Sequence, residues 1–347
     1  MHVSELETPS VLIDLPRMER NIRSMQARCD ALGLAFRPHI KTHKIPDIAQ
    51  RQLEAGAVGI ACQKVSEAEV FAQAGIQDIQ IPYNIVGERK TRRLAELALY
   101  NRVTVSADHP MVVAGLSDAA CALEMTIRVL VDLETDIHRT GAQPYEVLAL
   151  AQRIEGDENL HFAGLLVYPS DVSVRPALQE TLHLLDQVGI GVDSVSGGGT
   201  GAALVAADVP ELTELRVGTY VFHDWMQVTL GRATLDECAM HVAATVVSRP
   251  HTDRAILDSG SKTLAADRLD SGHGYILEYP EARIYQLNEE HAYVDLSACP
   301  ERPVIGERVH VIPVHACVVT NLHNQIYGVR DDVVEVTWPV AARGLVW

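Results

Sequence analysis

The sequence predicts an α/β protein, a (β/α)8 barrel of the TIM type followed by a mostly β C-terminal domain. Two observations lead to this fold class. Short apolar, β-rich runs alternate with amphipathic helical patterns up to residue 232, and about eight or nine such repeats exceed what an open doubly wound sheet needs. After residue 232, strands separated by turn residues continue without long helical patterns. We therefore expect a barrel domain over 12–232 and a β-rich domain over 233–347, which also takes the N-terminal residues 1–11.

The expected barrel strands are apolar runs bounded by turn residues. In chain order they cover residues 10–15, 35–40, 59–63, 78–83, 102–107, 126–133, 162–168, 192–198 and 214–222. Helical patterns such as "PRMERNIRSMQARCDALG" and "PYEVLALAQRIEG" lie between them, and glycine ends several of these helices. In the second domain, runs such as "HVAATVVSRP", "EARIYQLNE" and "ERVHVIPVHACVV" predict strands. Because the carboxyl ends of barrel strands face the active site, candidate site residues are sought there.

Composition narrows the class of partner. The chain has 29 Lys and Arg against 46 Asp and Glu, a formal charge of −17, which argues against nucleic acid and anionic membranes. The start lacks the pattern of a secretion signal, and no window resembles a membrane span. The six cysteines show no framework spacing, as is typical of a reducing compartment. We expect a cytoplasmic protein that acts on a small molecule.

A basic stretch at residues 37–44 stands out in this acidic chain. If "AFRPHIK" is a strand, its period of two places Arg37, His39 and Lys41 on one side, with Lys41 at the strand end. A lysine beside other cations has a lowered pKa, so its amine can form a Schiff base with an aldehyde. Lys44 is a rival, but it falls in the following turn. The alternative for the whole stretch is a solvated basic face.

The glycine-rich segment "SVSGGGTGA" (194–202) follows an expected strand and opens a helix, so its bare N–H groups suit a phosphate. The candidate phosphate residues here are Gly198, Gly199 and Thr200. Gly218 lies in the next expected strand and also leaves its backbone N–H accessible. Barrels commonly bind a phosphate at the loops after their last two strands. Residues 197–202 with Glu214 also mimic a dinucleotide fingerprint, but a Rossmann domain uses it in its first β–α unit. The other alternative is that the glycines only serve tight turns.

His315 and Cys317 in "PVHACVV" are two residues apart, which is one face of a strand. Imidazole and thiolate suit Zn²⁺, and two protein ligands leave positions open to water or substrate, as in a catalytic site. A buried cysteine beside a polar histidine is the alternative interpretation.

These motifs occur together in one family. "TPSVLIDL", "RPHIKTHK", "CQKVSEAEVFAQAGIQDI", "SGGGTG", "ELRVGTYVFHD", "ILDSGSKTL" and "PVHACVVTNLHN" resemble the D-threonine aldolase and D-serine dehydratase family, a branch of the alanine-racemase-fold enzymes. The resemblance runs from residue 7 to the "AARG" near the C-terminus. It implies a barrel that binds pyridoxal 5′-phosphate (PLP), a C-terminal β domain and usually a homodimer.

The resemblance also assigns roles to residues. It implies that Lys41 carries PLP, that Tyr168 lies near the cofactor ring and that Arg216 faces the pyridine nitrogen. Arg139 would lie near the phenolic oxygen of the cofactor, with a strand-end salt bridge as the alternative. The implied phosphate-side positions are Thr200, Gly218, Thr219 and Tyr220. His315 and Cys317 resemble a metal pair for a divalent ion, with Zn²⁺ expected and Mn²⁺ or Mg²⁺ as alternatives.

One segment departs from the family. After the tyrosine, relatives usually carry a glycine–histidine type segment, whereas this chain has "YPSDVS". The expected catalytic histidine is therefore absent, and Asp171 is the substitute that the segment offers. The proton acceptor and the substrate stay open at this point.

The resemblance implies a PLP- and divalent-metal-dependent lyase for D-3-hydroxy-α-amino acids. Two routes diverge: elimination, as in D-serine dehydratase, and retro-aldol cleavage to glycine and an aldehyde. The His-x-Cys pair and the missing histidine favour elimination. Further alternatives are an amino-acid racemase, which needs no metal, and a non-enzymatic PLP carrier, which needs no second domain. An NAD-dependent oxidoreductase is disfavoured by the late position of the glycine motif.

Overall fold

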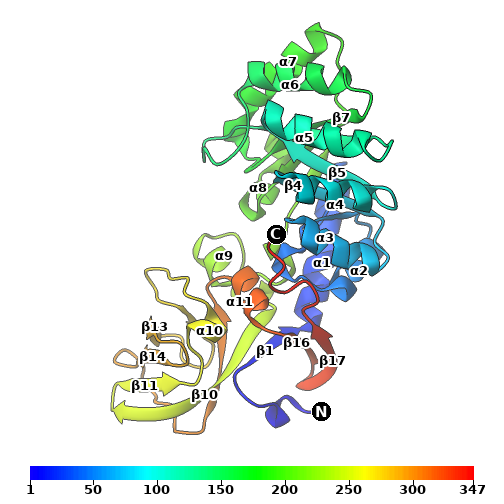
Figure 1. Cartoon of the computed structure of the whole chain (residues 1–347). Helices are drawn as coiled ribbons and strands as arrows, with labels where there is room; N and C mark the ends of the chain where they lie inside the picture. Colours follow the sequence, from blue (N-terminus) through cyan, green and yellow to red (C-terminus); the bar gives the residue numbers. More distant parts are fainter. The chain divides into compact units, whose positions relative to one another are not determined.

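The computed structural model describes all residues, Met1–Trp347. They form two compact units, which we describe one at a time. The barrel unit comprises residues 25–41, 46–218 and 345–347, and the β unit comprises residues 1–24, 42–45 and 219–344 (Figure 1). The units are interleaved along the chain, whereas the domains expected from the sequence are nearly continuous. Helix α1 (Leu15–Ala31) carries the chain from the first segment of the β unit into the barrel unit.

The barrel unit contains an eight-stranded parallel sheet in the order β2-β9-β8-β7-β6-β5-β4-β3. Its strands are β2 (Ala35–Phe36), β3 (Ile60–Ala61), β4 (Asp78–Asn84), β5 (Arg102–Ala107), β6 (Ile127–Leu133), β7 (Leu160–Val167), β8 (Ser194–Gly198) and β9 (Glu214–Arg216). A parallel bridge between His39 and Ala61 and a hydrogen bond from Ala61 N to Pro38 O (2.9 Å) bring the two ends of this order together. The sheet therefore curls on itself, and the predicted TIM-like fold is confirmed.

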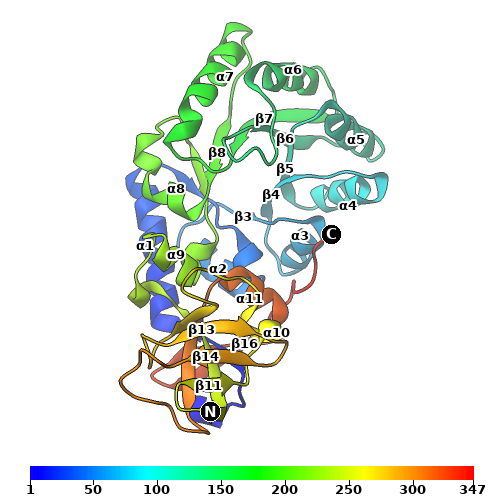
Figure 2. The same cartoon turned by 90° about the vertical axis from the view of Figure 1, so that its left-hand side faces the viewer.

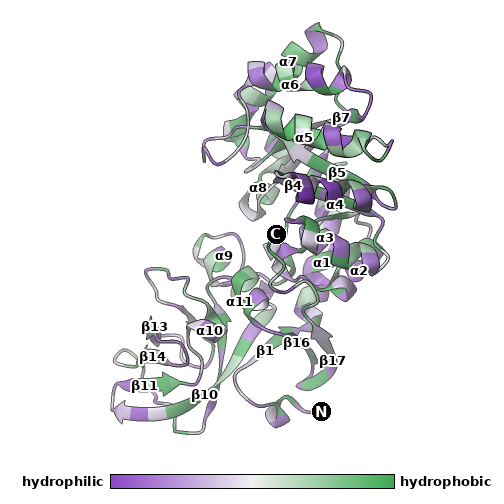
Figure 3. Cartoon of the chain, viewed as in Figure 1, coloured by the Kyte–Doolittle hydropathy of each residue, from purple (hydrophilic) through white to green (hydrophobic).

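Helices lie on the outside of this sheet (Figure 2). They are α2 (Pro46–Glu54), α3 (Val65–Gln73), α4 (Glu88–Ala98), α5 (Pro110–Cys121), α6 (Pro144–Glu155), α7 (Arg175–Gln187) and α8 (Thr200–Leu204). Proline at the first turn of α5, α6 and α7 fits positions whose N–H groups have no partner within the helix. The inner strands are apolar, while α4 is hydrophilic except where Thr91, Leu94 and Ala95 are buried (Figure 3). No helix of the structure has the length and apolar character that crossing a membrane requires.

The β unit is built on a nine-stranded sheet, as the mostly β second domain predicts. Its strands are β1 (Ser10–Asp14), β10 (Met240–His251), β11 (Arg254–Leu257), β12 (Gly274–Ile276), β13 (Arg283–Leu287), β14 (Ala292–Asp295), β15 (Arg308–Pro313), β16 (Gln325–Arg330) and β17 (Val333–Pro339). Short helices α9 (Trp225–Thr229), α10 (Ser261–Leu264) and α11 (Ala316–Leu322) connect them. Every strand pairing is antiparallel except that of β1 with β16.

Three of the strands expected from the sequence need correction. Residues 10–15 were counted among the barrel candidates, but β1 pairs with β10 and β16 in the β unit. The expected strand 35–40 ends at Phe36, because Pro38 has no N–H to donate, although His39 N still reaches Val217 O (2.9 Å). The expected strand 214–222 ends at Arg216 and continues as a 3₁₀ turn over Thr219–Val221.

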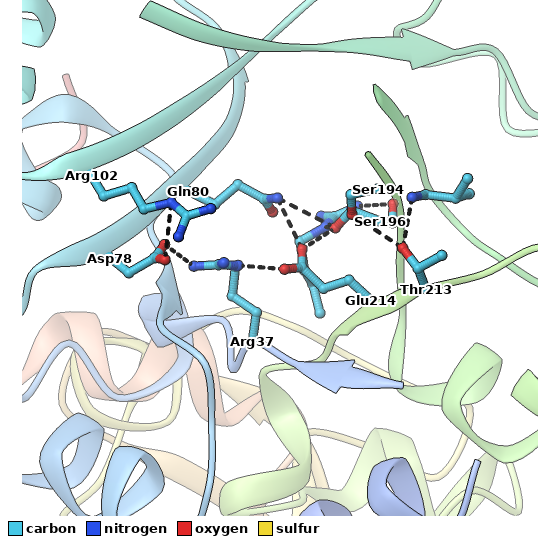
Figure 4. A network of polar contacts seen from close by, with 10 residues as sticks. Arg37, Asp78, Gln80, Arg102, Ser194, Ser196, Thr213 and Glu214 are labelled. Carbon is cyan, nitrogen blue, oxygen red and sulfur yellow. Dashed lines mark hydrogen bonds and ion pairs between the residues drawn. The ribbon is translucent and has the colours of Figure 1, made fainter. Parts of the chain in front are cut away.

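A buried ion-pair network crosses the interior of the barrel unit (Figure 4). Arg37 Nε donates to Glu214 Oε2 (2.8 Å), and Arg37 Nη1 donates to Asp78 Oδ1 (2.6 Å). Burial opposes ionisation of Glu214, but the charge of Arg37 and the hydrogen bonds from Ser196 and Arg37 outweigh it and hold the pKa of Glu214 below its ordinary value. Arg37 is therefore a neutralised structural cation, and not the unpaired cation that the sequence placed beside Lys41.

Replacement of Arg37 by Met should destabilise the protein strongly. The substitution removes the ion-pair partner of the buried Glu214 carboxylate, which costs about 3–5 kcal/mol of unfolding free energy. Arg92→Met is the matched control, because the Arg92–Glu96 pair is exposed and should contribute less than about 1 kcal/mol. Calorimetric unfolding of both variants measures the difference, and equal effects would contradict the structural role of Arg37.

Candidate active site

The candidate residues divide between the two units. The barrel unit holds Lys41, Arg139, Tyr168, Asp171, Gly198, Gly199, Thr200, Arg216 and Gly218. The β unit holds Thr219, Tyr220, His315 and Cys317. We describe the half-site of each unit separately.

Lys41 lies in a 3₁₀ turn over Ile40–Thr42, directly after the extended run that continues β2 to His39. Its position follows the carboxyl end of a barrel strand, as the sequence predicts, although the strand itself is shorter. Lys44, the rival, is buried in the β unit with a φ of 56°, and its Nζ donates to Ala342 O (3.3 Å). The Lys44 amine is therefore occupied by a backbone carbonyl.

Arg216 is the most constrained candidate residue of the barrel unit. It is 5% exposed, its Nε donates to Ser196 Oγ (2.8 Å), and its Nη2 donates to Val167 O (3.2 Å) and Ser196 O (3.1 Å). Burial lowers the pKa of Arg216 to about 10, against the charges of Glu214 and Asp132. The guanidinium is thus fixed through two of its nitrogens. A Cβ on Gly198 would lie 3.5 Å from its third nitrogen, Nη1, so this donor faces the glycine-rich turn.

Tyr168, which follows β7, forms a wall with the glycine-rich turn and Arg139. A Cβ on Gly198 would approach the Tyr168 Cδ2 to 3.3 Å and the Arg216 carbonyl oxygen to 3.0 Å, so a side chain would take up the space beside the ring. Gly199 has a φ of +113°, which disfavours other residues. The Arg139 guanidinium carbon lies 4.4 Å from the centre of the Tyr168 ring, a cation–π contact. Arg139, Tyr168, Gly198, Gly199 and Arg216 therefore lie close together, and their roles toward a cofactor stay predictions.

The loop that carries Arg139 is held by residues that the sequence reasoning missed. Thr140 Oγ1 donates to Asp132 Oδ2 (2.8 Å), Gly141 N donates to Asp108 Oδ2 (3.0 Å), and Thr135 Oγ1 donates to Tyr168 O (2.7 Å). Asp132 lies within β6, one residue before its end, and Asp108 directly follows β5. An acidic residue at the carboxyl end of a strand was the signal that could have found both.

Asp171 has a local structural partner. It caps the 3₁₀ turn Val172–Val174, and its Oδ1 accepts hydrogen bonds from Ser173 N (3.0 Å) and Ser173 Oγ (2.7 Å). One oxygen of the carboxylate is therefore already used by the turn. Its role as the substitute base stays a prediction.

In the β unit, His315 and Cys317 do not share a strand face, which corrects the sequence prediction. Strand β15 ends at Pro313, His315 is the N-cap of α11, and Cys317 lies in the first turn of this helix. Cys317 Sγ lies 3.3 Å from Thr42 Oγ1. His315 Nδ1 lies 3.7 Å from Asp267 Oδ1. A hydrogen bond with Cys317, together with the charges of Cys317, Asp224 and Asp267, raises the pKa of His315 to about 9 although burial opposes the charged form.

Asp224 anchors the helix that carries this pair. Its Oδ2 accepts a hydrogen bond from Ala316 N (3.0 Å), at the start of α11, and its Oδ1 accepts one from Gln227 N (3.0 Å), in the first turn of α9. Burial raises the pKa of Asp224 to about 6, although both backbone hydrogen bonds oppose the rise. The sequence reasoning missed this residue, but an aspartate just before a helix is a recognisable N-cap signal.

Both half-sites fit the groups that the sequence implies. Gly198 leaves room beside an aromatic ring and a fixed guanidinium, which suits a flat, acceptor-bearing cofactor such as PLP. No group of three or more His, Cys, Asp or Glu side chains is arranged to hold a metal ion. His315 and Cys317 are instead a two-donor set of imidazole and thiol, the kind that suits a divalent ion with positions open to water or substrate.

Comparison with known proteins identifies the family. The family described as "Alanine racemase, N-terminal domain" matches residues 13–224, and the "Putative serine dehydratase domain" matches residues 239–329. A D-threonine aldolase from Arthrobacter sp. is 37% identical over 362 residues, which cover 99% of this chain and 94% of the aldolase. The chain belongs to the D-threonine aldolase and D-serine dehydratase family.

Other members of this family extend the similarity in sequence and in structure. A D-threo-3-hydroxyaspartate dehydratase from Delftia sp. (strain HT23) is 31% identical over 349 residues, covering 90% of this chain and 91% of the dehydratase. The crystal structure of a D-threonine aldolase from Filomicrobium marinum matches with a TM-score of 0.91 and 33% identity, covering 99% of this chain and 97% of that chain. The family resemblance inferred from the sequence is confirmed. The expected homodimer and cytoplasmic location stay predictions.

Asp132 should make the stability of the protein depend on pH. Burial raises the pKa of Asp132 to about 6, although the hydrogen bond from Thr140 opposes the rise. The folded state therefore binds more protons than the unfolded state between about pH 4 and pH 6, and stability falls as the pH rises through this window. Asp132→Asn keeps an acceptor for Thr140 but removes the charge. Its melting temperature relative to wild type should rise by about 4 °C, or about 2 kcal/mol, between pH 4 and pH 7.

The exposed Asp118→Asn is the control for this measurement and should give a melting curve that stays parallel to wild type across the same pH range. If Asp132→Asn also stays parallel to wild type, the burial of an ionisable Asp132 is wrong.

Proposed function

We propose that the protein is a PLP- and divalent-metal-dependent lyase that acts on D-3-hydroxy-α-amino acids. Full-length similarity to aldolases and dehydratases of such compounds supports the reaction class. One observation carries the proposal: Thr42 directly follows Lys41, and its Oγ1 lies 3.3 Å from Cys317 Sγ. One peptide bond therefore joins the candidate cofactor lysine to a residue in contact with a candidate metal ligand.

The barrel half-site is suited to proton transfer at the substrate α-carbon. PLP, when bound, supplies an electron sink that stabilises negative charge at this carbon. Lys41 would hold the cofactor, and its Nζ would be placed to take the α-proton. Arg216 keeps its own proton at neutral pH, since its pKa is still about 10. Arg216 can therefore hydrogen-bond a ring nitrogen without protonating it, and a second electrophile at the β-carbon substituent becomes useful.

The β-unit half-site is suited to supply that electrophile. A divalent ion held by His315 and Cys317 provides a Lewis acid for the β-hydroxyl. Imidazole and thiolate donors favour Zn²⁺, with Mn²⁺ and Mg²⁺ as alternatives. Imidazole and thiol bind a metal ion in their deprotonated forms, so metal affinity should weaken as the pH falls. Asp224 keeps the start of α11 in place for both ligands.

Between the two routes, we favour elimination. A Lewis acid held by His315 and Cys317 would assist departure of the β-hydroxyl, so elimination would need no separate base at this hydroxyl. The "YPSDVS" segment lacks a histidine, and one Asp171 oxygen is engaged by Ser173, which supports this choice. Retro-aldol cleavage of D-threonine-like substrates to glycine and an aldehyde is the second candidate, and the 37% identity with a D-threonine aldolase favours it.

Borohydride reduction of the PLP-loaded protein should attach the cofactor to Lys41. Peptide mapping locates the modified lysine, and Lys41→Arg should lose the label while Lys44→Arg keeps it, since Lys44 Nζ is bound to a backbone carbonyl. A label on Lys44 or Lys262 would refute the assignment of Lys41.

A panel of amino acids on metal-loaded protein tests the reaction itself. D-Threonine, D-serine and D-3-hydroxyaspartate should react, with a keto acid and ammonia as products. D-Alanine should be turned over at least about 100-fold more slowly because it lacks the β-hydroxyl, and L-threonine because a fixed amine, hydroxyl and carboxylate admit one configuration. Chelation should abolish turnover and leave the PLP absorbance intact.

The other outcomes of the panel identify the alternatives. Glycine plus an aldehyde would establish retro-aldol cleavage in place of elimination. Brisk racemisation of alanine by metal-free protein would establish a racemase, and binding of PLP without turnover of any amino acid would leave a cofactor carrier.

A further inference from the structure

In the β unit, the carboxylate of Asp267 has a single side-chain partner, His315. Asp267 Oδ1 lies 3.7 Å from His315 Nδ1, and both side chains are one-third exposed. This separation exceeds the hydrogen-bond range, so the contact acts through charge. Neither oxygen of the Asp267 carboxylate receives a hydrogen bond from the protein, although the backbone carbonyl of Asp267 does accept one from His273 Nδ1 (3.0 Å). Its one side-chain partner is therefore His315.

The loop over residues 266–274, which we call the Asp267 loop, is built to hold this carboxylate in place. Leu269 and Gly272 exchange backbone hydrogen bonds of 3.0 and 2.9 Å across the turn. Gly272 has a φ of +117°, and a Cβ there would lie 2.4 Å from Ile284 O, so the turn packs closely on β13. A loop fixed in this way can present Asp267 at a constant position.

Contacts with Trp225 and Arg283 also hold the Asp267 loop. Trp225 Nε1 donates to Ser271 Oγ (2.9 Å), and the Trp225 ring stacks on Tyr275 with 4.5 Å between ring centroids. Arg283 Nη2 donates to Asp270 O (3.0 Å). Since Trp225 follows Asp224, the same short segment that anchors α11 also holds the Asp267 loop.

The charged groups around His315 differ in what they can do. Asp224 uses both carboxylate oxygens on backbone N–H groups, so it fixes the helix and not the imidazole ring. Cys317 is itself a candidate metal ligand. Only the Asp267 carboxylate faces a ring nitrogen of His315 without another hydrogen bond to make. A negative charge beside Nδ1 favours the tautomer that carries its hydrogen there, and the lone pair of Nε2 is then available for a metal ion.

We propose that Asp267 is the positioning residue of the metal site, which selects the tautomer and orientation of His315. This inference rests on the proposed metal-dependent function. Metal-binding histidines generally donate their second ring N–H to a carboxylate or carbonyl, and loss of that partner lowers metal affinity by about 10- to 100-fold. Asp267 takes this place in the β unit.

The test compares Asp267→Asn with Asp270→Asn, which alters an exposed carboxylate of the same loop. Zn²⁺ affinity is measured by competition with a chromophoric chelator, on full-length PLP-loaded protein. We expect Asp267→Asn to bind Zn²⁺ about 10- to 100-fold more weakly than wild type, and Asp270→Asn to match wild type. Asp267→Glu, which restores the charge, should recover part of the lost affinity. Equal affinity of Asp267→Asn and wild type would overturn the proposal, as would equal losses in both Asn variants.

The absorption spectrum of the Co²⁺-loaded protein gives a second readout, since it reports the ligand geometry and not the stability of the fold. We expect the spectrum of Asp267→Asn to differ from wild type while its PLP absorbance is unchanged, and identical Co²⁺ spectra would overturn the proposal. If wild type itself binds no stoichiometric Zn²⁺, or if His315→Ala with Cys317→Ala binds it equally well, the proposed metal function fails. That result is distinct from a failure confined to Asp267.

Discussion

The arrangement of the barrel half-site depends on one buried ion pair, Arg37 with Glu214. Glu214 accepts hydrogen bonds on Oε1 from Ser196 Oγ (2.5 Å) and Gln80 (3.0 Å), while Arg37 occupies Oε2 (2.8 Å). Ser196 Oγ in turn accepts the hydrogen bond from Arg216 Nε (2.8 Å). The position of the Arg216 guanidinium therefore depends on the Glu214 carboxylate, which must stay ionised. The charge of Arg37 favours this ionised form. Burial of such a network of polar groups costs free energy, and the loss of any member leaves its neighbours without a partner. The network therefore favours a single geometry.

The β half-site divides its work among two carboxylates and one thiol. Asp224 is saturated by backbone N–H groups and serves the helix start. Asp267 is held by a fixed loop and faces the imidazole. Cys317 is the candidate metal ligand, and its Sγ lies 3.3 Å from Thr42 Oγ1. Anchoring, orientation and ligation therefore belong to separate side chains, so that a change in one function leaves the others in place.

Sequence reasoning found the repeated architecture and the family, because β–α alternation and glycine-rich turns leave a local pattern. It failed for elements whose placement depends on contacts between residues far apart in the sequence. Residues 10–15 read as another barrel strand, and only the antiparallel register of Ser10 with Ala243 places them in the β unit. His315 and Cys317 read as strand neighbours, since a seven-residue helix after Pro313 has too few residues for a periodic signal. Asp267 acquires its role from a partner 48 residues away, which no local motif encodes.

The anchor of α11 has a consequence for how such enzymes diversify. Asp224 holds the backbone N–H of Ala316, so the start of α11 does not depend on the side chain at position 317. If this side chain ligates a metal ion, an oxygen donor can replace the sulfur donor without moving the helix start. A single codon change could then shift the preferred ion, with the scaffold left intact. Because Asp224 anchors the helix and position 317 supplies the donor, metal preference can change through one substitution. Enzymes from cells with different metal supplies can then share one architecture.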